Sequence, residues 1–108
     1  PVALTDASSV AVDLSLGNNF TLLCTSSVGN TRALANPTNA VAGQTGLITV
    51  TQASGGGNAL TFAANYKFAG GSSSAPSLTT TANAVDVLPY SVKSATEIVI
   101  GKPLSDVK

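Results

Sequence analysis

The chain has 108 residues, a length that suits one domain and is too short for two of ordinary size. Hydrophobic residues make up 44% of it and charged residues only 9%, against about 25% in a typical soluble domain, so disorder driven by charge is excluded. Five basic and five acidic residues cancel and are scattered along the chain, which excludes a basic surface for nucleic acid or for an anionic membrane.

The N-terminal part of the chain predicts a hairpin. The polar residues are mostly hydroxyl side chains, 13 Thr and 13 Ser, which suit strands and turns respectively. Over residues 10–16, aliphatic residues alternate with small or polar ones and share one face of a predicted strand. Residues 17–19 predict a turn and residues 20–25 the returning strand, so we expect the two strands to pair with each other.

The middle of the chain predicts three more strands. A short one is expected at residues 31–34, followed by a loop over residues 35–46, where a proline and glycines interrupt the pattern. Thr at alternate positions predicts a strand at residues 47–52, and residues 60–64 read as the strand that returns beside it. The three consecutive glycines at 55–57 are interpreted as an exposed, flexible hairpin loop between these two strands.

The C-terminal part predicts two further strands. Residues 67–69 are a short extended piece before a Gly/Ser-rich loop, and residues 78–83 are extended or form a turn. A strand at residues 84–92 contains Pro89, which favours an edge or a bulge because proline cannot donate to a ladder. The last strand covers residues 96–100.

About seven short strands predict an all-β fold, a small antiparallel β-sandwich or barrel. No window sustains helical periodicity, so any helix is expected to have one turn at most. We expect an N-terminal arm at residues 1–9, a β-domain at residues 10–100 and a C-terminal tail at residues 101–108. The phrase Asn-Ala-Val occurs at 39–41 and at 83–85, but the surrounding residues differ, and no internal repeat is predicted.

The sequence lacks the residues that most chemistry needs. It contains no histidine, which removes the usual general base, the commonest metal ligand and any Ser–His or Cys–His pair. Cys24 is the only cysteine and is interpreted as a small buried side chain, with an interchain disulfide as the alternative. Asp13 and Asp86 alternate with aliphatic neighbours and are predicted to face solvent. We therefore predict that the protein is not an enzyme and holds no metal and no cofactor.

Nothing in the sequence predicts a membrane partner. No segment approaches the roughly 20 apolar residues that a membrane-spanning helix needs. The first residues lack the basic start and apolar block of a signal peptide. Pro1 is a small residue of the kind left when an initiator Met is removed, so we expect a stand-alone gene product.

Six segments between Val12 and Val92 follow one another in a specific order. They are DLSLGNNFTL (Asp13 to Leu22), ANPTN (Ala35 to Asn39), AGQTG (Ala42 to Gly46), the strand Leu47 to Gln52, ANYKF (Ala64 to Phe68) and ANAVDVL (Ala82 to Leu88). In this order they resemble a β-rich module of tailed-bacteriophage virion proteins, found in fibre-type proteins and in small head-associated products. The resemblance implies a structural role at the surface of the virion, and assembly as a homotrimer with loops displayed outward.

Within that class we expect a capsid decoration, or cement, protein that binds the major capsid protein or another virion protein. A tail-fibre module that recognises a host surface glycan is the alternative. No catalytic residues belong to the pattern, and neither nucleic acid nor membrane is expected as a partner. Two aromatic residues, Tyr66 and Phe68, are expected to lie either in the core or on a contact surface. The residues expected to contact partners are Pro1, Val2, Ala3, Leu4, Tyr66, Phe68, Pro103 and Leu104.

Overall fold

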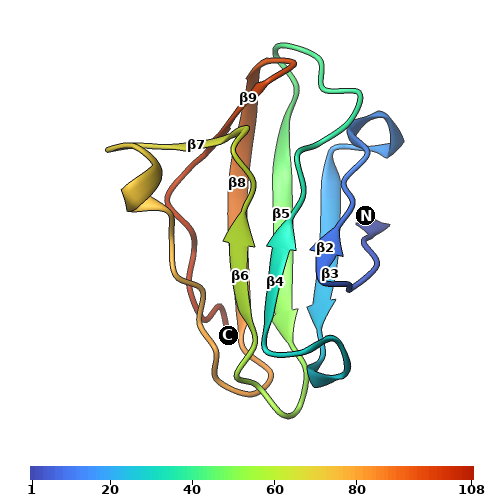
Figure 1. Ribbon diagram of the computed structural model, residues 1–108, viewed down its shortest axis with the longest axis vertical. Coiled ribbons are helices and arrows are strands. Elements are labelled where there is room, and N and C mark those ends of the chain that lie inside the picture. The colour runs from blue at the N-terminus through green and yellow to red at the C-terminus, as the bar shows by residue number, and fades with distance from the viewer.

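The computed structural model describes the backbone of residues 1–108 and every side chain except that of Ser72. The chain forms nine strands and three short 3₁₀ helices (Figure 1). The strands are β1 (Val2–Ala3), β2 (Ser9–Val10), β3 (Asn19–Cys24), β4 (Thr31–Leu34), β5 (Thr45–Gln52), β6 (Ala59–Phe62), β7 (Tyr66–Phe68), β8 (Val85–Ser94) and β9 (Glu97–Ile100). The 3₁₀ helices are η1 (Leu14–Leu16), η2 (Ser26–Val28) and η3 (Ser72–Ser74).

The first six strands form a β-solenoid of about three turns. The chain alternates between two sheets: β1, β3 and β5 lie side by side in one, and β2, β4 and β6 form the other. All neighbours within these two sets are parallel. Phe20 pairs with Ile48 and Arg32 pairs with Leu60, so on both sheets the partner lies 28 residues later in the chain. The second and third coils therefore stack in one common register.

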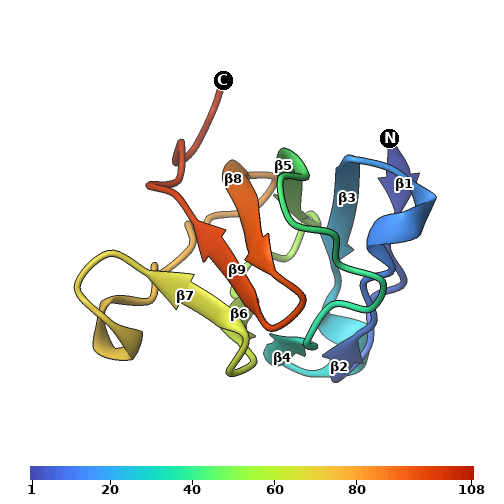
Figure 2. The ribbon, with the colours of Figure 1, turned by 90° about the horizontal axis from the view of Figure 1, so that it is seen from above.

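The C-terminal strands end the solenoid on one of its two sheets. β8 pairs antiparallel with β5, β9 pairs antiparallel with β8, and β7 pairs parallel with β9. Together they extend the first sheet to six strands in the order β1-β3-β5-β8-β9-β7, whereas the second sheet keeps three (Figure 2). β8 thus occupies the edge of β5 on which a fourth coil would have to pair.

The all-β class is confirmed, but the antiparallel sandwich or barrel is wrong, because the fold is a mixed, largely parallel solenoid. The predicted hairpin of residues 10–16 and 20–25 does not form. β2 ends at Val10 and pairs with β4 in the three-stranded sheet, while β3 belongs to the six-stranded sheet. Of the alternating aliphatic residues after Val10, Val12 lies in an irregular segment, and Leu14 and Leu16 lie in η1, where the Asp13 carboxylate accepts a hydrogen bond from the Ser15 N–H (3.0 Å).

The triple glycine is a corner between sheets and not the loop of a hairpin. It leads from β5 in one sheet to β6 in the other. Gly56 has a φ of 59° and lies against the backbone of Thr80 and Ala82, where an added Cβ would come within 2.6 Å of the Thr80 oxygen. Here glycine is needed both for its positive φ and for this close approach.

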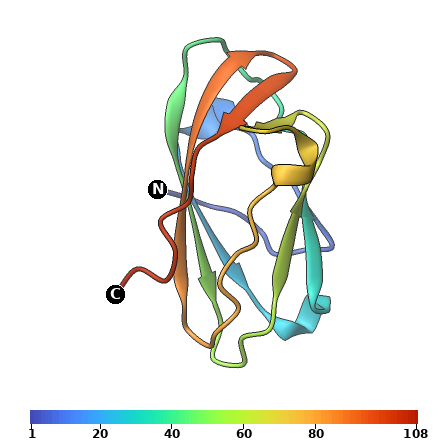
Figure 3. The same ribbon diagram turned by 90° about the vertical axis from the view of Figure 1, so that its left-hand side faces the viewer.

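The core lies between the two sheets, which Figure 3 shows edge-on. Alternate residues of β3, β5 and β8 point into it, among them Phe20, Ile48 and Leu88, each no more than 2% exposed. The prediction that Asp86 faces solvent is wrong. Asp86 is 2% exposed, while its neighbours in β8, Val85 and Val87, point outward. The Asp86 carboxylate is satisfied by two backbone N–H groups, those of Thr79 and Asp106, each at 2.7 Å.

The residues predicted as an N-terminal arm are paired in the sheets. Val2 and Ala3 form β1 beside β3, and the Leu4 N–H donates to the Thr21 oxygen at 2.7 Å. Asp6 forms an ion pair with Arg32, whose side chain is fully buried (Nε to Oδ1, 2.8 Å). Val2 and Leu4 are half-buried and contact the core, so this segment is the first coil of the solenoid.

Candidate functional site

The carboxylates of the chain are engaged in structural contacts. Asp6 pairs with Arg32, Asp13 accepts from Ser15 and Asn39, Asp86 accepts from two backbone groups, Glu97 pairs with Lys93, and Asp106 pairs with Lys108. Among the described residues, no group of three or more His, Cys, Asp or Glu residues lies close enough to hold a metal ion.

Cys24 is buried, as the sequence predicted. Burial raises the pKa of the thiol, and the nearby Asp6 charge acts in the same direction while Arg32 opposes it. A thiol that is fully enclosed and holds its proton is a poor nucleophile. The side chain therefore serves packing, between β3 and the sheet opposite.

One face of the six-stranded sheet carries no charge at its centre. We call this the outer face and define it by the side chains of β3, β5 and β8 that point away from the core: Asn19, Thr21, Leu23, Leu47, Thr49, Thr51, Val85, Val87 and Pro89. The ladder aligns them in three rows, so that Thr21, Thr49 and Val87 lie side by side in the middle row. Hydroxyl and aliphatic side chains are mixed across this surface.

Most of the exposed large hydrophobic residues lie on or beside this outer face. Seven such residues are known among the described side chains, and five of them belong here. Leu23 (54% exposed) and Leu47 (43%) are on the face itself, and Val99 is on the neighbouring strand β9. Leu104 and Val107 are held at the edge of β8 by backbone hydrogen bonds to Val87 and Val85. Grouping of exposed apolar side chains on one face is typical of contact surfaces.

Both chain ends lie on the same side of the molecule as the outer face (Figures 2 and 3). Of the predicted contact residues, Pro1, Ala3 and Leu104 are exposed, while Val2, Leu4 and Pro103 are half-buried. Ala3 pairs with Thr21, and Leu104 bridges to Val87, so they flank the middle row from opposite edges. The structure thus brings Ala3 and Leu104 to one surface, whereas Val2 and Leu4 pack against the core and Pro103 lines a hollow beside Phe68.

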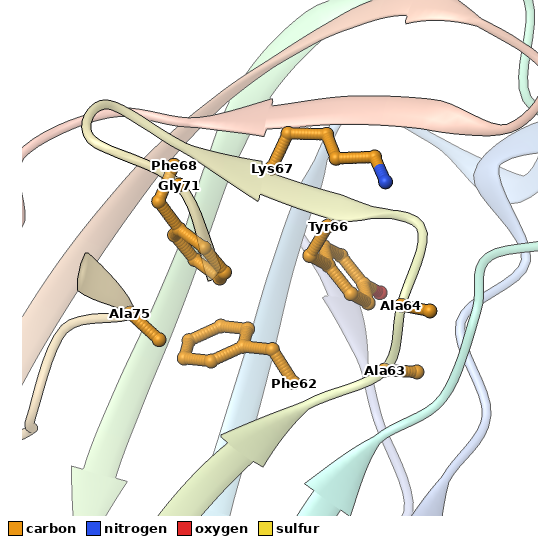
Figure 4. A pocket seen from close by; sticks show the side chains of 8 residues that line it. All are labelled: Phe62, Ala63, Ala64, Tyr66, Lys67, Phe68, Gly71 and Ala75. Carbon is orange, nitrogen blue, oxygen red and sulfur yellow. The ribbon is translucent and has the colours of Figure 1, made fainter. Parts of the chain in front are cut away.

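The other two predicted contact residues lie elsewhere, in an aromatic pocket (Figure 4). Tyr66 is buried, and its hydroxyl donates to the Ala35 oxygen at 2.9 Å; burial raises the pKa of this phenol, helped by Tyr90. The half-buried Phe68 ring meets Phe62 edge to face, with centroids 5.1 Å apart. The pocket has a volume of about 400 Å³ and is lined by Phe62, Ala63, Ala64, Tyr66, Lys67, Phe68, Gly71 and Ala75.

The lining of this aromatic pocket suits an apolar guest. Figure 4 shows the rings of Phe62, Tyr66 and Phe68 turned toward one another, while Lys67 extends from the opposite side of β7. The Tyr66 hydroxyl is already bonded outside the pocket. A second hollow of about 210 Å³ shares Phe68 and reaches Lys102 and Pro103. Sequence reasoning identified Tyr66 and Phe68 but missed Phe62, whose assignment to a strand face gave no sign that a pocket opens beside it.

No helix in the described part of the chain is long and apolar enough to cross a membrane. A comparison of the sequence with family models gave no match, and comparisons with curated proteins and with solved structures gave no significant match either.

Proposed function

We propose that the protein is a structural virion protein of a tailed bacteriophage, a capsid decoration protein that stabilises the head through protein–protein contacts made by the outer face. The uncharged outer face is the observation that supports this proposal, together with the resemblance of the sequence segments to phage virion modules. Burying Leu23, Leu47 and Val87 removes apolar surface from water without desolvating any charge.

The size of the outer face supports binding by several linked copies. With strands about 4.8 Å apart and about 3.3 Å of rise per residue, three strands and six residues give a face of about 300 Å². A standard interface buries roughly 800 Å² on each partner, so one copy alone binds weakly. Linked faces bind much more tightly than single ones, and the homotrimer implied by the resemblance supplies three of them.

Reconstitution on phage heads that lack the protein tests this proposal. We expect the wild type to bind and to raise the temperature at which heads release DNA. Thr49→Lys places a charge at the centre of the outer face and should abolish both effects, because the charge would be desolvated on binding. Thr31→Lys, at an exposed position of β4 on the other sheet, is the matched control. Equal binding by both variants would exclude the outer face as the capsid contact.

The aromatic pocket supports a second candidate function, a tail-fibre module that recognises a host surface glycan. Sugar rings stack on aromatic faces, and Phe62 and Phe68 are half-exposed. In that case the isolated protein should block phage adsorption, and Ala75→Glu, which narrows the pocket from an exposed position, should lose this effect. Copy number separates the two candidates: hundreds of copies per particle fit decoration, and a few to a few dozen fit a fibre.

A further inference from the structure

The first coil of the solenoid has two open edges. β1 and β2 are the first strands of their sheets, and each pairs on one side only (Figure 2). The Leu4 N–H bonds to β3, so the N–H and C=O of the preceding residue, Ala3, point to the open side of β1. On β2 the Ser8 and Val10 oxygens accept bonds from the second coil, so the N–H and C=O of Ser9 point outward in the same way.

This end of the molecule lacks the charged residues that usually protect a sheet edge. Between residues 1 and 12 the only charged side chain is Asp6, and it is paired with the buried Arg32. The exposed residues of the two strands and of the segments beside them are small: Ala3, Thr5, Ser8, Ser9 and Ala11. Another strand can therefore approach either edge without burying an unpaired charge.

The opposite end of the solenoid differs in two ways. β7, the other edge of the six-stranded sheet, carries the exposed Lys67 at its middle position, where a lysine opposes pairing. The three-stranded sheet stops earlier, at β6, because β8, β9 and β7 extend only the first sheet. A contact that continues both sheets at once is therefore available at the first coil and not at the opposite end.

The presence of two open edges determines which partner fits. A single extended peptide can pair with only one of them. A partner that pairs with both must carry two strand edges at the separation of packed sheets, about 10 Å, and the first coil of a second copy carries such a pair. A two-fold rotation places each edge against itself, and antiparallel strands then exchange N–H and C=O groups in both directions.

We propose that two copies of this chain pair through their first coils about a two-fold axis, with β1 beside β1 of the second copy and β2 beside β2. Both sheets then continue from one copy into the other. Leu16, which is 64% exposed and lines a hollow with Pro1 and Val2, adds apolar surface at this end. A two-fold contact uses the same surface on both copies, so it stops at a pair. The contact lies at the edge of β1 and does not depend on the proposed capsid contact.

Sedimentation equilibrium with two proline variants tests the inference. Ala3→Pro and Ser9→Pro each remove an N–H that points to an open edge, so the single copy should still fold while pairing is blocked. We expect the wild type to approach twice the mass of either variant as the concentration rises to about 1 mM, with Kd raised at least about tenfold in both variants. A trimer held by other surfaces would become a hexamer, and the variants would still have half the wild-type mass.

A second pair of variants uses charge in place of proline. Ala3→Lys puts a lysine from each copy beside the shared axis and should also halve the mass. Ala95→Lys, in the exposed turn between β8 and β9, is the matched control and should pair like the wild type. Equal masses for the wild type and both proline variants at about 1 mM would overturn the inference.

Amide hydrogen exchange shows directly which edges pair. The N–H groups of Ala3 and Ser9 should exchange at least about tenfold more slowly in concentrated than in dilute wild-type protein, because pairing removes them from water. Exchange at these two positions that is independent of concentration would overturn the inference, even if the mass doubles through another surface. Loss of head binding by Thr49→Lys with unchanged protection of Ala3 and Ser9 would leave it intact.

Discussion

At the scale of single residues, the most constrained side chain is Arg32. Its guanidinium is buried and satisfied from several directions: Nε and Nη2 donate to Asp6, and Nη2 also donates to the carbonyl oxygens of Thr25 (2.8 Å) and Gly29 (3.2 Å). Asp6 in turn accepts from the Thr25 N–H at 2.8 Å. These contacts fasten the first coil and the η2 corner to the second coil.

Removing one partner of this pair should be costly. Arg32→Ala leaves the Asp6 carboxylate, 11% exposed, without its counter-ion, and we expect the free energy of unfolding to fall by about 3–5 kcal/mol. Lys93→Ala removes an exposed ion pair and should change it by less than about 0.5 kcal/mol. Urea denaturation of both variants measures the difference. Equal, small losses would mean that the buried pair contributes nothing to stability.

The same pair predicts a loss of stability in acid. Burial by itself raises the pKa of Asp6, but the hydrogen bond from the Thr25 N–H and the bond and charge of Arg32 outweigh it and hold the pKa below 3.8. Because the folded state binds the proton less readily than the unfolded state, the stabilisation is complete above the ordinary pKa and disappears as the pH falls below about 4. Thermal unfolding from pH 6 to pH 2 should show this decline, and Asp6→Asn should flatten it.

Sequence reasoning misplaced several of these residues for a physical reason. The alternation of residues along a strand identifies its two faces. It does not show which face is buried when both faces carry apolar residues. In β8 the buried face holds Asp86 with Leu88 and Tyr90, and the outward face holds Val85 and Val87. Asp86 is accommodated only because a loop and the C-terminal tail bring backbone donors to it, and those partners are distant in the sequence.

At the scale of elements, strand positions were predictable and strand pairing was not. The predicted strands at residues 31–34, 47–52 and 96–100 agree closely with β4, β5 and β9. The predicted pairing of residues 47–52 with residues 60–64 was wrong because a short glycine-rich connection suits both a hairpin and a corner that crosses to the opposite sheet. A signal for the coils does exist: Ser, Gly and Asn at positions 26, 29 and 30 recur at 54, 57 and 58, which is the 28-residue offset of the ladder.

Gly46, the second residue of β5, gives a test of this stacking. Gly46 lies 28 residues after Asn18, in the same position of the next coil, and a Cβ added there would come within 1.8 Å of the Asn18 oxygen. That oxygen also accepts the Tyr90 hydroxyl at 2.7 Å. Gly46→Ala should therefore separate the coils and destabilise the protein by at least about 3 kcal/mol, in the range of severe backbone effects.

Gly55→Ala is the matched control for this substitution. At Gly55 the φ is not positive and the nearest atom to an added Cβ is the Ser26 hydroxyl at 3.5 Å, an ordinary contact. We expect a change within about 1 kcal/mol. Chemical denaturation of both variants measures the difference in their free energies of unfolding, and a Gly46→Ala protein as stable as the wild type would contradict the described stacking.

At the scale of the whole molecule, the C-terminal tail completes the six-stranded sheet. Residues 102–108 follow β9 and pair with the first half of β8, through mutual hydrogen bonds of Val87 and Leu104 (2.9 Å each) and a bond from Val107 to Val85 (2.7 Å). The tail also donates one of the two hydrogen bonds that satisfy Asp86. A tail of this kind has a stabilising role beyond any contact with partners.

Truncation after Gly101 should expose this edge. Losing three backbone hydrogen bonds and one bond to a carboxylate should lower the free energy of unfolding by about 2–4 kcal/mol. The exposed edge of β8 should also promote aggregation, because an unpaired strand is a template for other chains. Leu104→Ser keeps the backbone bonds at a 63% exposed position and should remain soluble and nearly as stable. Light scattering and urea denaturation distinguish the two variants.

The common register of the second and third coils allows the solenoid to be lengthened by inserting a unit between them. β8 closes the far side of β5, whereas the second coil is built on a 28-residue unit that fits between neighbours of the same register. Duplicating residues 19–46 in tandem should therefore insert an additional rung and lengthen the molecule by about 4.8 Å, with the terminal hairpin still in place. A chain of this design would work as a molecular ruler whose length is set by the number of inserted units.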